Sequence, residues 1–255
     1  MIRGIYTAAT GMLVQDIKQD LITNNIANIN TPGYKKSEVS VSSFPQVLLS
    51  KIDGEKGSQN GSKPIGAYSN GVMIDREVID WQNGSLEETG NNSDLALLGT
   101  GFFTLQTAQG VRYSQNGSFK VDGQGYLVNN QGDYVLGTNG RILVGENNFK
   151  VDPNGAVTVD GTNVDYLRIT NFTDPSYLTR QGSDLYTAIN QAQARNLAPE
   201  EVQIKQGFIE KPNFNLVNEM VNMIMVMRSY ESGQKTIQAQ DEILGKSVND
   251  IASVR

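Results

Sequence analysis

A helical pattern breaks off inside the segment Asn24-Asn25-Ile26-Ala27-Asn28-Ile29-Asn30-Thr31-Pro32-Gly33-Tyr34. Upstream of it, apolar residues recur largely at steps of three and four, which is the spacing of one helix face. The Thr31-Pro32-Gly33 triplet ends such a pattern, because proline and glycine both interrupt helices. The asparagines before it are mediocre helix formers. We therefore predict an N-terminal helical element over residues 1–34 that is stabilised by packing against a partner.

The C-terminal segment carries a second and longer helical pattern, which we predict to run from Asn215 to Ile251. Asn215 suits the N-cap position, and Glu219 suits the positive end of the helix dipole. Steps of three and four alternate through Met220, Met223, Met227, Tyr230, Gln234, Ile237, Asp241, Leu244, Val248 and Ile251. This heptad spacing predicts a coiled-coil-like seam, with two polar interruptions. The helix would be about 55 Å long at about 1.5 Å per residue, and its nearest candidate partner is the N-terminal helix.

One part of this second pattern is apolar on nearly every face. Residues 220–227 read Met-Val-Asn-Met-Ile-Met-Val-Met. A helix that is apolar all round is buried on all sides, and methionine adapts to imperfectly matched surfaces. In a two-helix pair the additional cover must come from other subunits. The alternative is ordinary core inside a compact bundle.

The middle of the chain has a different composition, dense in turn dipeptides. Asn-Gly and Asp-Gly favour type I′ hairpin turns, since both central residues need a positive φ. They occur at Asp53-Gly54, Asn60-Gly61, Asn70-Gly71, Asn83-Gly84, Asn116-Gly117, Asp122-Gly123, Asn139-Gly140, Asn154-Gly155 and Asp160-Gly161. Strand-like runs lie between them at 101–106, 119–122, 126–128, 134–136, 141–144, 156–159 and 167–172. This spacing predicts antiparallel β structure.

The predicted fold class is therefore α+β, with an antiparallel β-rich outer domain at 86–206 between an N-terminal helical domain and a C-terminal helical domain at 207–255. An extended connector would occupy 35–85, and its Gly-, Ser- and Asn-rich stretch 53–70 is expected to be mobile or ordered by a partner. The predicted core of the β region consists of Leu97, Phe102, Phe103, Phe119, Leu127, Val135, Val144, Val157 and Leu167.

Composition excludes several classes of function. The net charge of −6 argues against a nucleic-acid partner, which needs a basic face. There is no cysteine and no histidine, so thiol chemistry, histidine-based catalysis and the commonest metal ligands are missing. We expect no catalytic residue, no cofactor and no metal site. No run approaches the roughly 20 apolar residues that span a bilayer, so we expect no direct membrane insertion.

Export would have to use a route without a cleaved signal peptide, because Met1-Ile2-Arg3-Gly4 lacks the apolar core of a secretory signal. Two alternatives to an assembly protein remain open. One is a secreted β-rich carbohydrate-active enzyme, which would need two carboxylates about 5–10 Å apart in an aromatic cleft. The chain has one tryptophan, Trp81, placed outside the expected strands. The other alternative is a surface adhesin or phage-tail subunit.

Both ends of the chain resemble the flagellar rod, hook and hook-associated proteins. The N-terminal resemblance lies in Ile5-Tyr6-Thr7-Ala8-Ala9-Thr10-Gly11-Met12 and in the run from Asn24 to Lys35. At the other end, the segment from Asn215 to Ile224 and Arg228-Ser229-Tyr230-Glu231 are similar to the family's C-terminal helix. In the middle, 94–103 and 112–119 resemble the β domain shared by rod and hook subunits.

The resemblance implies a structural subunit of the flagellar basal body that is exported by the flagellar type III apparatus and assembles helically to transmit torque. It implies copies of itself and other axial proteins as partners, and the length favours a rod subunit over a hook protein. Whether that subunit is proximal or distal stays open. The candidate subunit-interaction residues are Ile5, Met12, Asn24, Asn25, Asn28, Pro32, Gly33, Tyr34, Met220, Met223, Ile224, Met227, Tyr230, Ile237 and Leu244.

Overall fold

A computed structural model of the protein describes residues 2–52, 62–145, 149–189 and 194–252. The chain forms two compact units, and each is discontinuous in sequence. Unit 1 comprises Met1–Asn24, Ser37–Val78 and Val217–Arg255. Unit 2 comprises Asn25–Lys36 and Ile79–Leu216. The segment that ends the N-terminal helical pattern therefore groups with the β-rich unit.

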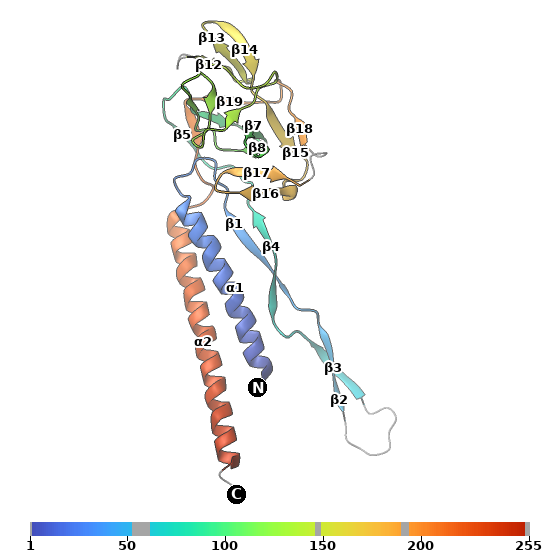
Figure 1. Ribbon diagram of the computed structural model, residues 1–255. Helices are drawn as coiled ribbons and strands as arrows, with labels where there is room; N and C mark the ends of the chain where they lie inside the picture. Colours follow the sequence, from blue (N-terminus) through green and yellow to red (C-terminus); the bar gives the residue numbers. More distant parts are fainter. Residues whose placement is uncertain (1, 53–61, 146–148, 190–193, 253–255) are drawn as a thin grey trace. The chain divides into compact units, whose positions relative to one another are not determined.

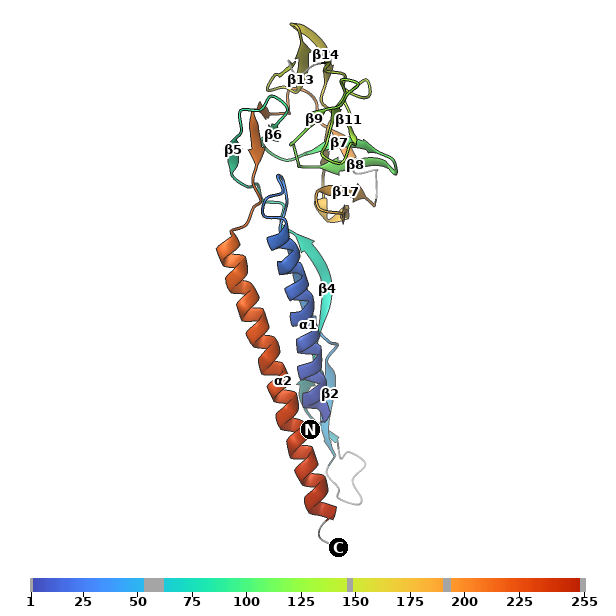
Figure 2. The ribbon, with the colours of Figure 1, turned by 60° about the vertical axis from the view of Figure 1, so that its left-hand side comes forward.

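The two terminal helices supply most of unit 1. Helix α1 spans Ile2–Ala27 and α2 spans Leu216–Ala252, and they lie side by side in both views (Figures 1 and 2). They run antiparallel, because Gly4 lies opposite Gln240 and Met12 lies opposite Gly233. No helix among the described residues is both long and apolar enough to span a bilayer. The predicted α+β class with two terminal helices is confirmed.

Helix α1 ends earlier and helix α2 begins later than the predicted helical domains. Helix α1 stops at Ala27 rather than near Tyr34, and the Thr31 amide then donates to the Asn28 carbonyl oxygen at 3.0 Å. Residues 207–215 are not helical, since strand β20 occupies Phe208–Glu210. Helix α2 then starts at Leu216, so Asn215 holds the predicted N-cap position and Glu219 the first turn.

The predicted heptad seam of α2 consists of two alternating sets of positions. One set is half-buried as predicted, and the other is shifted by one residue toward the N-terminus. Met223, Tyr230, Ile237 and Leu244 are half-buried, as a seam requires, but Met220 and Met227 are exposed. The other inward positions are instead Glu219, Val226, Gly233 and Gln240. The physical reason is close approach at Gly233, where an added Cβ would lie 2.6 Å from Met12 Cγ. A glycine therefore faces α1 where the pattern had placed Gln234.

The predicted connector is largely β structure. Strands β1 (Ser37–Ser43) and β4 (Val72–Ile79) pair with each other. Strands β2 (Val47–Ile52) and β3 (Ser62–Tyr68) form an antiparallel hairpin. Within the stretch 53–70, which was predicted to be mobile or ordered by a partner, β3 pairs with β2 of the same chain, and the part at 53–61 lies outside the described residues.

Unit 2 is built from antiparallel sheets. Within the described residues the largest sheet has nine strands, in the order β16-β17-β8-β7-β11-β10-β9, with β15 also on β7 and β18 on β15. Their bounds are β7 Phe102–Thr107, β8 Gly110–Ser114, β9 Lys120–Val121, β10 Leu127–Val128, β11 Tyr134–Val135, β15 Ile169–Phe172, β16 Leu178–Gln181, β17 Leu185–Ala188 and β18 Ala194–Asn196.

Smaller sheets complete this unit. A three-stranded sheet contains β12 (Phe149–Val151), β13 (Ala156–Val159) and β14 (Thr162–Tyr166). Two short pairs join β6 (Leu95–Leu97) to β19 (Ile204–Gln206) and β5 (Leu86–Glu88) to β20. A 3-10 helix, η1, covers Pro175–Tyr177. The run expected as a strand at 141–144 makes isolated bridges instead.

The turn dipeptides serve more than one turn type. Asp160 and Gly161 have φ values of 50° and 79° and join β13 to β14, as expected for a type I′ turn. At Asn116-Gly117 and Asp122-Gly123 neither residue has a positive φ. There the Asn or Asp side chain accepts a hydrogen bond from the backbone amide two residues later. Asp122 Oδ1, for example, accepts from the Gln124 amide at 2.9 Å. Such Asx turns compete with the type I′ geometry that the dipeptide also favours.

The predicted core of unit 2 is confirmed, since all nine residues are buried. Most belong to one apolar cluster that includes Phe103, Leu127 and Val157. Phe102 belongs to a second cluster with Tyr186. Trp81 packs against both of these rings, with centroids 5.3 Å and 5.0 Å away, which gives the only tryptophan in the sequence a structural place.

Candidate assembly interface

The start of α2 presents a wide apolar surface, which we call the α2 face. Its exposed members are Val217, Met220, Val221, Ile224, Met225 and Met227. Met220 and Ile224 are 52% and 50% exposed, while Val226 on the same turns is buried. The helix pair therefore covers one side of this segment and leaves the remaining apolar sides in solvent. Contiguous apolar surface of this kind marks interaction sites.

Helix α1 also has exposed apolar residues. Tyr6, Leu13 and Ile17 recur at steps of seven and four, so they follow one side of the helix. On the side toward α2 the residues are small, and a groove of about 460 Å³ runs between the helices. Its lining residues are Gly4, Thr7, Ala8, Gly11, Met12, Gln15, Ser229, Ser232, Gly233 and Thr236.

The structure separates the predicted interaction residues of unit 1 into two groups. Met220, Ile224 and Met227 belong to the α2 face, and Asn24 is also exposed. Ile5, Met12, Met223, Tyr230, Ile237 and Leu244 are half-buried in the single chain. A role in contacts between subunits remains a prediction for both groups. The first group has the surface that such contacts require.

The predicted residues from Asn25 to Tyr34 lie in unit 2, and several of them have partners within the chain. Asn25 and Tyr34 are buried, and the Tyr34 hydroxyl donates to Asn25 Oδ1 at 3.2 Å. Gly33 has a φ of +67°, and a Cβ there would overlap the backbone carbonyl of Gln115. Only glycine suits this position, because both the backbone angle and the close approach exclude a side chain. Asn28 and Pro32 are half-buried.

A buried ion pair lies directly after these residues. Lys35 Nζ is 2.8 Å from Glu210 Oε1, and the two side chains are 1% and 6% exposed. Lys35 also donates to the Gln82 carbonyl oxygen at 2.8 Å, and Glu210 accepts the Gly84 amide at 2.6 Å. Burying two charges is tolerated when each has such additional hydrogen bonds. The pair joins segments that are 175 residues apart in the sequence.

Arg180 extends this network from strand β16. Its Nη1 donates to the Tyr34 hydroxyl at 2.8 Å, and its Nη2 donates to the Lys35 carbonyl oxygen. The guanidinium also stacks on the Tyr34 ring, 4.4 Å from its centroid. Burial raises the pKa of the nearby Tyr186 hydroxyl, and the positive charge of Arg180 offsets part of that rise.

Asn213 completes the network close to α2. Its Nδ2 donates to the Asp80 carbonyl oxygen at 2.8 Å and to the Gln82 carbonyl oxygen at 3.2 Å. Its Oδ1 accepts the Lys36 amide at 2.9 Å. The Asp80 amide in turn donates to the Lys36 carbonyl oxygen at 2.9 Å. Asn213 thus cross-links two backbone segments through both ends of its amide.

Sequence reasoning missed Lys35, Arg180, Glu210 and Asn213. Their roles depend on pairings over long sequence separations, which no local pattern reveals. The one local signal was Lys35, at the end of the quoted N-terminal run, and it carried no indication of a partner.

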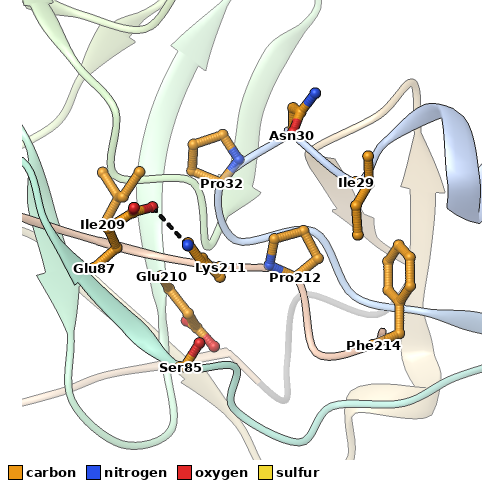
Figure 3. Close-up of a pocket in the computed structure, with 10 residues that line it drawn as sticks. All are labelled: Ile29, Asn30, Pro32, Ser85, Glu87, Ile209, Glu210, Lys211, Pro212 and Phe214. Atoms are coloured by element: carbon orange, nitrogen blue, oxygen red, sulfur yellow. Dashed lines mark ion pairs between the residues drawn. The ribbon is translucent and has the colours of Figure 1, made fainter. Parts of the chain in front are cut away.

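A pocket of about 520 Å³ opens in unit 2 and shares Glu210 with this network (Figure 3). Its apolar lining consists of Ile29, Pro32, Ile209, Pro212 and Phe214, and its polar lining of Asn30, Ser85, Glu87, Glu210 and Lys211. Lys211 and Glu87 form an ion pair at 3.1 Å with both side chains about half exposed. The described residues contain no cluster of three or more acidic, histidine or cysteine side chains suited to a metal ion.

Comparison with known protein families gives matches in three parts of the chain. Residues 5–35 match the family described as flagella basal body rod protein. Residues 96–159 match the flagellar hook protein FlgE/F/G D1 domain, and residues 205–251 match the flagellar basal body rod FlgEFG protein C-terminal family. The matched ends include most of α1 and most of α2.

Similar full-length proteins support the same assignment. The chain is 33% identical to the flagellar basal-body rod protein FlgG of Bacillus subtilis, over 98% of this chain and 99% of that protein. It is 31% identical to the flagellar hook-basal body complex protein FlhO of the same organism, with both chains covered completely. It is 27% identical to the flagellar basal-body rod protein FlgF of Caulobacter vibrioides, again over both complete chains. The chain therefore belongs to the flagellar basal-body rod protein family.

Proposed function

We propose that this protein is a structural subunit of the flagellar basal-body rod that assembles through its terminal helices and transmits torque. The observation that carries the proposal is the α2 face, where Met220, Ile224 and neighbouring apolar side chains stand in solvent although the helix is paired. Covering this surface with another subunit would remove a large apolar area from water, which favours association.

The geometry also suits open-ended assembly. The α2 face and the exposed residues Tyr6, Leu13 and Ile17 of α1 are different surfaces of one chain. Contacts between two different surfaces propagate into helical filaments unless the rotation closes a ring. We propose copies of this chain and neighbouring axial proteins of the rod and hook as the partners.

Family membership places the protein in the flagellar basal body. We propose that it reaches this location through the flagellar type III export apparatus, without a cleaved signal peptide. The proposal assigns it no catalytic activity and no cofactor. The absence of histidine and cysteine from the sequence supports this, since it removes thiol nucleophiles and the most frequent acid–base group.

Assembly of the purified full-length chain tests the proposal. Sedimentation velocity at increasing protein concentration is expected to show growing particles, and electron microscopy is expected to show rod-like filaments. Deleting residues 216–252 should abolish growth while the thermal transition of unit 2 persists. A chain that stays monomeric at every concentration, with and without a family partner from the same flagellum, contradicts the proposal.

A further inference from the structure

Asparagine–glycine pairs are places where a side chain can react with its own backbone. The glycine amide nitrogen attacks the asparagine Cγ, and glycine has no side chain that would block the approach. The attack requires that both reacting groups be able to move into line, so hydrogen bonds that hold either group oppose it. Among the described residues such pairs occur at Asn70-Gly71, Asn83-Gly84, Asn116-Gly117, Asn139-Gly140 and Asn154-Gly155.

Two of these pairs have both reacting groups held by hydrogen bonds. In Asn83-Gly84 the glycine amide donates to Glu210 Oε1 at 2.6 Å. In Asn154-Gly155 the glycine amide donates to the Asp152 carbonyl oxygen at 2.9 Å. The asparagine side chain of each pair is also hydrogen-bonded to a backbone group. The fold therefore opposes the reaction at both pairs.

Two other pairs have the asparagine side chain held by a carboxylate. Asn116 Nδ2 donates to Asp184 Oδ2 at 2.7 Å, and Asn116 Oδ1 accepts from the Ser118 amide at 3.0 Å. Asn139 Nδ2 donates to Asp165 Oδ1 at 3.1 Å. These bonds must break before either side chain can turn toward its glycine.

Asn70-Gly71, between β3 and β4, is different from the other four pairs. Asn70 is exposed, and neither its side-chain amide nor the Gly71 amide is hydrogen-bonded to any residue that the structure describes. The carbonyl oxygens of the pair are engaged instead. That of Asn70 accepts from Thr7 Oγ1 at 3.2 Å, and that of Gly71 accepts from the Phe44 amide at 3.0 Å. The segment is thus anchored while both reacting groups stay available.

We propose that Asn70 is a modification site, at which the folded chain deamidates spontaneously and ahead of the other four described pairs. Base removes the Gly71 amide proton, and the nitrogen then attacks Asn70 Cγ. A new C–N bond forms, the bond from Cγ to the side-chain nitrogen breaks, and ammonia leaves. Water opens the resulting cyclic imide at one of its two carbonyls, which gives aspartate or isoaspartate. Either product replaces a neutral amide with a negative charge.

The isoaspartate product also changes the backbone within unit 1. The chain then continues through Cγ of residue 70, so the carbonyl oxygen that accepts from Thr7 becomes part of a side-chain carboxylate. The added backbone carbon displaces Gly71, whose carbonyl oxygen accepts from the Phe44 amide. Thr7 belongs to α1, so the modification loosens the contact of this turn with the helix. The reaction needs the folded single chain and does not depend on assembly.

Mass spectrometry of the incubated full-length chain tests the proposal by following conversion at each asparagine. Asn60-Gly61 lies outside the described residues, so Asn60→Gln is introduced in every protein. At mildly alkaline pH, Asn70 is expected to convert about tenfold faster than the asparagines of the other four described pairs, since those must first break hydrogen bonds. Conversion at Asn70 that is no faster than at the others overturns the proposal.

The same chain in denaturant shows whether the fold is responsible. Unfolding removes the protecting hydrogen bonds, so all described pairs should then convert at similar rates. If Asn70 alone stays fast in denaturant, its neighbours in sequence rather than the structure select it, and the proposal fails.

Asn70→Gln is the matched control, because it keeps the amide but requires a larger ring that forms more slowly. This variant should show no conversion at residue 70. In the parent, hydrogen exchange at the Phe44 amide should become about tenfold faster in the converted fraction, while the incubated variant keeps its protection. Equal protection in the two incubated proteins would count against the proposed loosening of this turn.

Discussion

Ile224→Glu should separate assembly from folding. Ile224 is 50% exposed in the single chain, so a glutamate there can remain in water until another subunit covers it. Covering the exposed half of an isoleucine contributes about 1 kcal/mol, which the variant loses. Burying an unpaired carboxylate costs about 2–3 kcal/mol more, after water or protonation relieves part of the penalty. The sum of about 3–4 kcal/mol per subunit corresponds to a roughly 100- to 1,000-fold higher concentration for assembly.

The assay is sedimentation of parent and variant over a concentration series, with circular dichroism and thermal unfolding of the dilute proteins. Gln238→Glu is the control, because it adds the same charge at an exposed position of α2 outside the apolar segment. It should assemble almost like the parent. Met223→Glu is a useful contrast, since Met223 is half-buried in the single chain and its replacement should also reduce the helix content of the monomer.

Two outcomes would refute the reasoning about the α2 face. The first is assembly of Ile224→Glu at the concentration that suffices for the parent. The second is loss of the unit 2 thermal transition, because Ile224 belongs to unit 1 and unit 2 should not depend on it.

Three further predictions concern unit 2. Gly117→Ala should lower its stability by more than about 2 kcal/mol in denaturant titration, because the new Cβ would overlap the backbone carbonyl of Leu95; an unchanged midpoint would contradict this. Burial raises the pKa of Tyr186 above its ordinary value near 10, so the folded state keeps a proton that the unfolded state loses, and stability should fall as pH rises above about 10. Tyr186→Phe should lessen this alkaline loss in thermal scans, and equal losses in both proteins would argue against it. A fragment of residues 25–216 should melt cooperatively at a higher temperature than one of 35–216, which lacks Tyr34; similar midpoints would show that 25–34 contribute little.

The sequence was sufficient for the features that depend on local spacing. The heptad steps gave both terminal helices, and the breaker at Thr31-Pro32-Gly33 marked the end of the first to within a few residues. The strand-like runs between the turn dipeptides contained eight of the nine predicted core residues of unit 2, and all nine are buried. These signals are local because side-chain direction repeats with a fixed period in helices and strands.

Local spacing did not determine which residues of α2 face inward. A segment that is apolar all round satisfies several seams equally well, so residues 220–227 do not distinguish Met220 from Val226 as the inward position. The inward positions are determined by close packing, because the absence of a side chain at Gly233 leaves room for Met12 of the opposing helix.

The buried ion pair between Lys35 and Glu210 depended entirely on tertiary structure. Lys35 and Glu210 are individually ordinary charged residues, and charged residues are exposed by default. They are buried here because the fold brings together segments that are 175 residues apart, where each charge finds its counter-charge and backbone partners. Pairing at that separation is encoded by the packing of the whole chain, which a periodic pattern along a single segment does not contain.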